Sequence, residues 1–146
     1  AIELAYRCQL RMCEVLDLRE SDIKETGLEI HRRKGSKGNL VLFGDSVNAV
    51  LTLSRSLPFP TVRPINPTLV RGVSGNKLAE KGFSTAWRRL MDKAESMGLN
   101  RFTFHQLKAK GVSDTKGNKQ DASGHKSAAM VGVYDRKLKE VKPAGE

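Results

Sequence analysis

Five side chains suited to phosphate chemistry are spread along this 146-residue chain. His105 is followed three residues later by Lys108, Tyr134 comes nine residues after His125, and Arg11 lies far upstream. Basic side chains of this kind bind phosphate, imidazoles transfer protons, and a phenol can act as a nucleophile. The set therefore predicts a site that attacks a phosphodiester with a protein side chain.

Such a reaction makes specific demands on its catalyst. The transition state carries extra negative charge on the non-bridging oxygens, and fixed cations must meet that charge. Arginine suits this task because its planar fork donates two parallel hydrogen bonds to phosphate. A tyrosine hydroxyl, with a reference pKa of about 10, needs cations or a base beside it. The leaving oxygen needs a proton, which a lysine on a loop can supply.

The first half of the chain predicts the elements that must position these groups. Residues 2–17 are predicted as one helix, because apolar residues fall near one face and no Gly or Pro interrupts them. Residues 28–33 and 39–43 are predicted as two strands, joined by the turn 34–38 with its two glycines. A helix over about 46–56 is expected to begin with the cap Asp45-Ser46.

The second half begins with residues 57–68, where four of the five prolines predict an extended loop. A helix is expected from a cap at Ser84 to Gly98, with Trp87 in the core. Three further segments follow: a helix carrying His105 and Lys108, a polar loop over 115–122, and a short apolar stretch, 128–133, that leads to Tyr134. The predicted fold class is mainly α with a small antiparallel β-sheet (α+β).

The composition of the chain limits the classes of molecule that it is expected to bind. The chain has 26 Lys and Arg against 16 Asp and Glu, a formal charge of +10, which favours a polyanion such as nucleic acid. A basic protein on a membrane surface is the competing interpretation, but no stretch joins a basic face to a broad apolar one, and no apolar run is long enough to span a bilayer. Cys8 and Cys13 are spaced to lie on different helix faces and are expected to be unpaired core thiols. No cofactor, metal site or small-molecule ligand is expected.

Taken in order, these pieces resemble the catalytic domain of the tyrosine recombinases, the phage integrase family. Gln9-Leu10-Arg11, with Glu14-Val15 and Asp22-Ile23 after it, is similar to the family's first arginine box. His105-Gln106-Leu107-Lys108 is similar to its His-x-x-Arg box, and Gly124-His125-Lys126-Ser127 to its Leu-Gly-His-Ser box. Tyr134 follows at the distance of the nucleophile.

The resemblance implies a role for each residue. Tyr134 would attack a DNA phosphate to form a 3′-phosphotyrosyl bond, while Arg11, Lys108 and His125 hold that phosphate. His105 would assist proton transfer, and Lys34, or its neighbour Lys37, would protonate the leaving oxygen. The whole would carry out site-specific DNA recombination as a phage or prophage integrase. Glu14 would be a supporting residue.

Two positions depart from the family pattern. Lys108 stands where the family has its second arginine, which keeps the charge and loses the bidentate fork. Ser123 stands where an apolar leucine is usual, and it is expected to loosen the packing that orients His125. These departures leave open a DNA-binding remnant with impaired catalysis. A topoisomerase of the type IB class is a third alternative, which exchange between two duplexes would distinguish.

The same resemblance implies how the chain is organised. Residues 1–137 would form the integrase catalytic domain and residues 138–146 a charged C-terminal tail, with the N-terminal core-binding domain absent from this chain. The implied partners are double-stranded DNA at attachment sites and further copies in a homo-tetramer, with no membrane. The implied location is the cytoplasm of a bacterial host, at the nucleoid.

Overall fold

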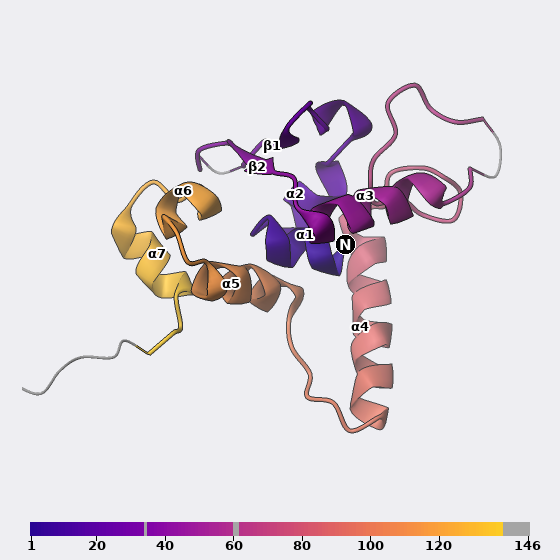
Figure 1. Ribbon diagram of the computed structural model, residues 1–146. Coiled ribbons are helices and arrows are strands. Elements are labelled where there is room, and N and C mark those ends of the chain that lie inside the picture. The colour runs from indigo at the N-terminus through magenta and orange to yellow at the C-terminus, as the bar shows by residue number, and fades with distance from the viewer. Residues whose placement is uncertain (34, 60–61, 139–146) are drawn as a thin grey trace, which may run out of the picture.

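The computed structural model describes residues 1–33, 35–59 and 62–138. In chain order the elements are α1 (Ile2–Arg7), α2 (Met12–Asp17), the 3-10 turn η1 (Glu20–Asp22), β1 (Gly27–Ile30), β2 (Asn39–Leu42), α3 (Asp45–Ser56), α4 (Glu80–Ser96), α5 (Phe104–Asp114), α6 (Lys119–Ser123) and α7 (Ala128–Tyr134) (Figure 1). Helices with one small antiparallel sheet confirm the predicted fold class. Within the described residues, no helix has the length and apolar character needed to cross a membrane.

The core lies around α1, which contacts both α3 and α5. Strands β1 and β2 pair antiparallel, with Leu28 opposite Val41 and Ile30 opposite Asn39, and Leu28 and Ile30 point into the core. The strands therefore lie where the sequence predicted them, although β1 ends three residues early. The buried apolar side chains of this core are Leu4, Ala5, Cys8, Leu10, Val15, Leu16, Leu18, Leu28, Ile30, Val47, Leu51, Leu69, Phe83 and Phe104.

The first predicted helix, 2–17, is wrong as a single element. It breaks between α1 and α2, where Gln9 takes a left-handed backbone with φ 52°. Arg11 is consequently the N-cap of α2 and does not lie inside a helix. The break frees the carbonyls of Cys8 and Gln9, and the guanidinium of Arg32 binds both. A partner 23 residues away along the chain from Gln9 thus stabilises a break that no Gly or Pro announces.

Two helix starts also differ from prediction. Helix α4 begins at Glu80 with Ala79 as its N-cap, so Ser84 lies inside the helix and does not cap it. Helix α3 begins at Asp45, capped by Gly44. The end of α4 agrees with prediction, since Gly98 follows it at φ 81°. Trp87 packs edge-on against Phe102 and Phe104, as expected of a core residue.

The C-terminal helices α5, α6 and α7 contact one another (Figure 1). The predicted loop 115–122 is wrong in its second half, where α6 forms because the side chain of Asn118 accepts hydrogen bonds from the Gln120 and Asp121 amides.

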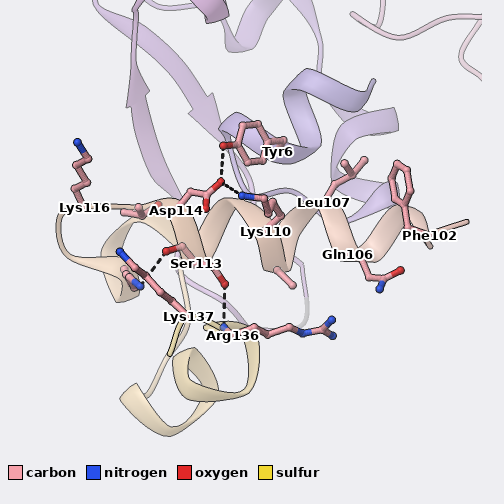
Figure 2. A pocket seen from close by; sticks show the side chains of 13 residues that line it. Tyr6, Phe102, Gln106, Leu107, Lys110, Ser113, Asp114, Lys116, Arg136 and Lys137 are labelled. Atoms are coloured by element: carbon pink, nitrogen blue, oxygen red, sulfur yellow. Dashed lines mark hydrogen bonds and ion pairs between the residues drawn. The ribbon is translucent and has the colours of Figure 1, made fainter. Parts of the chain in front are cut away.

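A side-chain hydrogen bond joins α1 to the end of α5. The Tyr6 hydroxyl donates to Asp114 at 2.7 Å (Figure 2).

The two cysteines are both free thiols, as predicted. Cys8 is buried in the core, and burial raises the pKa of its thiol to about 12. Cys13 is only half-buried, so the prediction of two core thiols holds for Cys8 alone.

Candidate active site

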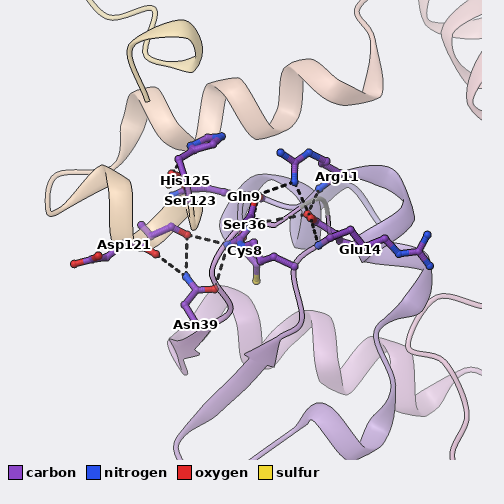
Figure 3. Close-up of polar contacts among 12 residues, drawn as sticks. Cys8, Gln9, Arg11, Glu14, Ser36, Asn39, Asp121, Ser123 and His125 are labelled. Atoms are coloured by element: carbon purple, nitrogen blue, oxygen red, sulfur yellow. Dashed lines mark hydrogen bonds and ion pairs between the residues drawn. The ribbon is translucent and has the colours of Figure 1, made fainter. Parts of the chain in front are cut away.

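Arg11 is held at the start of α2 by a buried carboxylate. Glu14, three residues later, accepts the Arg11 backbone N–H at 2.8 Å and the Arg11 guanidinium at 2.9 Å (Figure 3). It also accepts the backbone N–H of Arg33 at 3.3 Å. Burial alone would raise the pKa of Glu14, but these hydrogen bonds and the charge of Lys108 hold it below its usual value. Glu14 therefore stays ionised and fixes Arg11.

Arg32 is a buried residue of the site that the sequence did not reveal. Its fully buried guanidinium donates to the carbonyl of Gln9 at 2.7 Å, the side-chain oxygen of Asn39 at 3.2 Å and the carbonyl of Ala122 at 2.9 Å. It thereby ties the break after α1 to the sheet and to α6. One signal could have found it: in the predicted strand 28–33, residue alternation puts Arg32 on the same face as Leu28 and Ile30.

Lys108 is the least expected residue of the site. It lies on α5, its side chain is fully buried, and its Nζ has no hydrogen-bond partner among the described residues. Burial, with the nearby charges of Arg32 and Arg11, lowers the pKa of its ammonium to about 7. The position therefore holds a cation that is poorly solvated and available to an incoming anion.

His125 is equally buried, at 3% exposure. Its Nδ1 lies 2.7 Å from the hydroxyl of Ser123, while its Nε2 has no partner within the described chain. Burial, with the charges of Lys108, Arg11 and Arg32, lowers the pKa of His125 to about 4. The expectation that Ser123 loosens the surroundings of His125 is wrong, because Ser123 is fully buried and contacts the ring directly.

Tyr134 brings the two histidines and Lys108 together. Its ring centre lies 4.6 Å from that of His125 and 5.4 Å from that of His105, and Lys108 Nζ is 5.7 Å from it. His105 and Lys108, three residues apart on α5, share the face that meets this ring. Burial and the charge of Lys108 lower the pKa of His105. Its side chain is more exposed than those of Lys108, His125 and Tyr134.

The chain beyond Tyr134 is fastened to its neighbours. The hydroxyl of Ser113, on α5, donates to the Tyr134 carbonyl at 3.3 Å. The same hydroxyl accepts the Arg136 amide at 2.9 Å (Figure 2). The ammonium of Lys119, on α6, donates to Asp135 at 2.6 Å. These bonds hold the tyrosine against helices of its own chain.

The basic turn between the strands lies beside Arg11. Ser36 is 3.5 Å from the Arg11 guanidinium (Figure 3), and the Lys37 amide donates to the Gly124 carbonyl at 2.9 Å. Lys34, a predicted site residue, lies outside the described residues. Lys37, its alternative, is exposed on the same turn.

The structure thus brings Arg11, His105, Lys108, His125 and Tyr134 into one site. Within the part of the chain that the structure describes, Lys108 Nζ and His125 Nε2 are buried without partners, and such groups are costly unless a ligand completes them. The surrounding charge is positive, which would favour an anion as that ligand. The ring of Tyr134 lies beside both groups. Among the described residues, no cluster of three or more His, Cys, Asp or Glu side chains could hold a metal ion.

Comparison with known proteins bears on this site. A family model described as the phage integrase family matches residues 1–140. No curated protein sequence matches the chain significantly. Solved structures with the same fold include a XerA recombinase, which is 19% identical with a TM-score of 0.68, covering 93% of this chain and 52% of the other.

Two further structures contain DNA. A lambda integrase fragment, described as a dimer bound to a COC′ core site, is 20% identical with a TM-score of 0.73, covering 97% of this chain and 54% of the other. The Tn1549 transposon integrase, described in complex with circular intermediate DNA, is 13% identical with a TM-score of 0.71, covering 94% and 53%. The chain spans about half the length of these proteins, and the likeness establishes a shared fold.

Proposed function

The chain belongs to the phage integrase family, and on that premise we propose that it is the catalytic domain of a site-specific DNA recombinase of a phage or prophage. The observation that carries the proposal is a pair of buried nitrogens beside Tyr134, Lys108 Nζ and His125 Nε2, for which the described residues offer no hydrogen-bond partner. A phosphate oxygen would supply the partner that both lack. Arg11, fixed by Glu14, would meet the same phosphate.

Double-stranded DNA is the proposed substrate. The chain carries a charge of +10, which suits a phosphate backbone, and the lambda and Tn1549 structures are described with their DNA sites. Strand exchange between two duplexes breaks four strands in all. If each copy of the chain supplies one tyrosine, the assembly on DNA is a homo-tetramer.

The proposed chemistry is a reversible transfer of a phosphoryl group. The Tyr134 oxygen attacks the phosphorus, the bond to the 5′ oxygen breaks, and a 3′-phosphotyrosyl bond forms. The phenol proton passes toward His105, and the 5′ oxygen leaves with a proton from the basic turn, where Lys34 or Lys37 is the donor. Arg11 and Lys108 offset the charge on the non-bridging oxygens. The 5′ hydroxyl of a partner strand reverses the step. The energy of the phosphodiester bond is thereby conserved, and no ATP is consumed.

The replacement of arginine by Lys108 sets a condition on this chemistry. With its pKa lowered to about 7, Lys108 loses its proton much more readily than an exposed lysine does. A bound phosphate favours the charged form, so the site gains a proton as it binds DNA. The arrangement supports catalysis and also supports the alternative, a DNA-binding remnant, if Lys108 binds the ground state and the transition state equally.

A trapping experiment separates these functions. A library of duplexes with random core sequence, each nicked so that the cleaved fragment diffuses away, is incubated with wild type, Tyr134→Phe and Tyr6→Phe. The matched control uses the chain's other tyrosine, which bonds Asp114 away from the site. We expect covalent complexes from wild type and Tyr6→Phe only, with the DNA on the peptide that contains Tyr134.

A complex that survives Tyr134→Phe would overturn the assignment of the nucleophile. Duplexes retained by wild type without a covalent bond, at any pH from 6 to 9, would instead support the remnant. Sequencing the trapped duplexes identifies the preferred site.

A further inference from the structure

The hydroxyl of Ser123 makes two short hydrogen bonds, one with a backbone carbonyl and one with the ring of His125. Ser123 is fully buried at the end of α6, and its Oγ lies 2.6 Å from the Lys119 carbonyl oxygen and 2.7 Å from Nδ1 of His125. Gly124 between them has φ 69°, which turns the chain so that the imidazole folds back onto the serine. A side chain at Gly124 would meet the Lys37 carbonyl at 2.3 Å, so this turn is fixed by its surroundings.

Counting hydrogens decides the direction of each bond. The Lys119 carbonyl oxygen can only accept, and at 2.6 Å it requires the single hydrogen of the Ser123 hydroxyl. The Ser123 oxygen then has only lone pairs to offer His125, so Nδ1 must carry a hydrogen and donate it. In the neutral ring, Nε2 is therefore the nitrogen without a hydrogen, and it is the one with no partner among the described residues.

We propose that Ser123 is a positioning residue that fixes the tautomer and orientation of His125, so that Nε2 is always the nitrogen presented to the scissile phosphate. This inference rests on the proposed function for the identity of the ligand, but not for the tautomer. Ser123 holds Nδ1–H in both charge states of the ring. Only the charged ring has a hydrogen on Nε2 to donate to a phosphate oxygen, so contact with DNA requires His125 to gain a proton.

The surroundings of His125 explain why that proton arrives with the substrate. Helix α5 contributes Lys108 and His105, the segment around α2 contributes Arg11 and Glu14, and the chain after β1 contributes Arg32. Burial, together with the charges of Lys108, Arg11 and Arg32, lowers the pKa of His125 and keeps the ring neutral in the free protein, and Glu14 opposes this only in part. A bound phosphate places negative charge beside Nε2, which raises the pKa of His125 and favours the charged ring. A Ser123 that merely filled space would leave the tautomer undefined.

The first test reads the tautomer directly in the DNA-free protein. Long-range ¹H–¹⁵N spectra of protein with ¹⁵N-labelled histidine at pH 7 distinguish the two neutral forms, and His125→Gln assigns the signal. We expect the Nδ1–H form for His125 in wild type, and the Nε2–H form or a mixture in Ser123→Ala. An Nε2–H form in wild type, or a pure Nδ1–H form that persists in Ser123→Ala, would overturn the proposal.

The second test uses the trapped covalent complex. Ser123→Ala should slow its formation by about 10- to 100-fold, as for other partners that orient a functional histidine, with DNA affinity within about twofold of wild type. Ser96→Ala is the matched control, because Ser96 donates to a carbonyl of its own helix with no histidine beside it. Equal rates in Ser123→Ala and wild type would contradict the catalytic role. Were wild type to form no complex at all, the proposed function would fail while the tautomer result stood.

Discussion

The Nζ atom of Lys108 lies 5.7 Å from the centre of the Tyr134 ring, in a site where the same Nζ has no hydrogen-bond partner among the described residues. A cation at this distance gains a modest attraction from the face of the ring. That attraction does not replace water, so the charge on Lys108 remains costly until an anion enters. The residue that departs from the family pattern thus links the free energy of folding to the pH and, under the proposed function, to the binding of DNA.

Removing the buried amine should stabilise the protein and inactivate it. Lys108→Met keeps most of the side-chain volume and removes the desolvated charge. We expect the free energy of unfolding at pH 6 to rise by about 1–4 kcal/mol, while covalent complex formation falls by about two to three orders of magnitude. Urea unfolding and the trapping assay measure the two effects. Lys110→Met, at an exposed lysine paired with Asp114, is the control and should leave the stability nearly unchanged. A destabilised Lys108→Met would refute the prediction.

The stability gap between wild type and Lys108→Met should shrink as the pH rises. The pKa of Lys108 is about 7 in the folded protein against 10.5 when exposed, so from pH 7 to 10.5 the unfolded chain binds more protons than the folded one. The titration of Lys108 therefore raises the free energy of unfolding of wild type as the pH rises from 7 to 10.5. Comparing the two proteins by urea unfolding at pH 6, 8 and 10 cancels the other titrating groups. A gap that stayed constant would show that Lys108 keeps an ordinary pKa.

DNA affinity should weaken as the pH is raised above 7. If phosphate binds the charged form of Lys108, each pH unit above its pKa adds the cost of taking up a proton, at most about tenfold in the dissociation constant. Fluorescence anisotropy at constant ionic strength measures this slope, since phosphate contacts also respond to salt. Lys108→Arg stays charged throughout and should make the slope shallower by this amount, leaving the part that comes from proton uptake at His125. Parallel slopes in the two proteins would argue against proton uptake at Lys108.

Loss of Arg32 should destabilise the site far more than loss of its neighbour. Arg32→Ala leaves the carbonyls of Cys8 and Gln9 without this donor, while the Ala122 carbonyl keeps only Asn39, and we expect the loss to cost about 3 kcal/mol or more. Arg33→Ala removes only an exposed ion pair with Asp17 and should cost about 1 kcal/mol or less. Chemical unfolding of both variants checks the contrast. Similar losses in the two would mean that Arg32 does not hold these segments together.

Several features followed from the sequence because their causes are local. Two short apolar runs joined by a turn with two glycines indicate β1 and β2, and three-residue spacing places His105 and Lys108 on one helix face. The order of motifs from Arg11 to Tyr134 was enough to indicate the family, which the match over residues 1–140 then established. The start of α4 at Glu80 was missed because its N-cap, Ala79, has no capping side chain to mark it.

Other features depended on partners distant in the chain, which local patterns do not record. The first helix breaks at Gln9 because Arg32 receives the freed carbonyls. Sequence alone placed a positive charge at position 108, but only the packed structure removed its water and lowered its pKa. From the sequence, Ser123 was expected to loosen the packing around His125, because the family has leucine at this position. In the folded chain its hydroxyl contacts the His125 ring. The sequence by itself therefore determined which reactive groups this protein has, and the tertiary structure decided their protonation, because desolvation and hydrogen bonding arise only when distant segments meet.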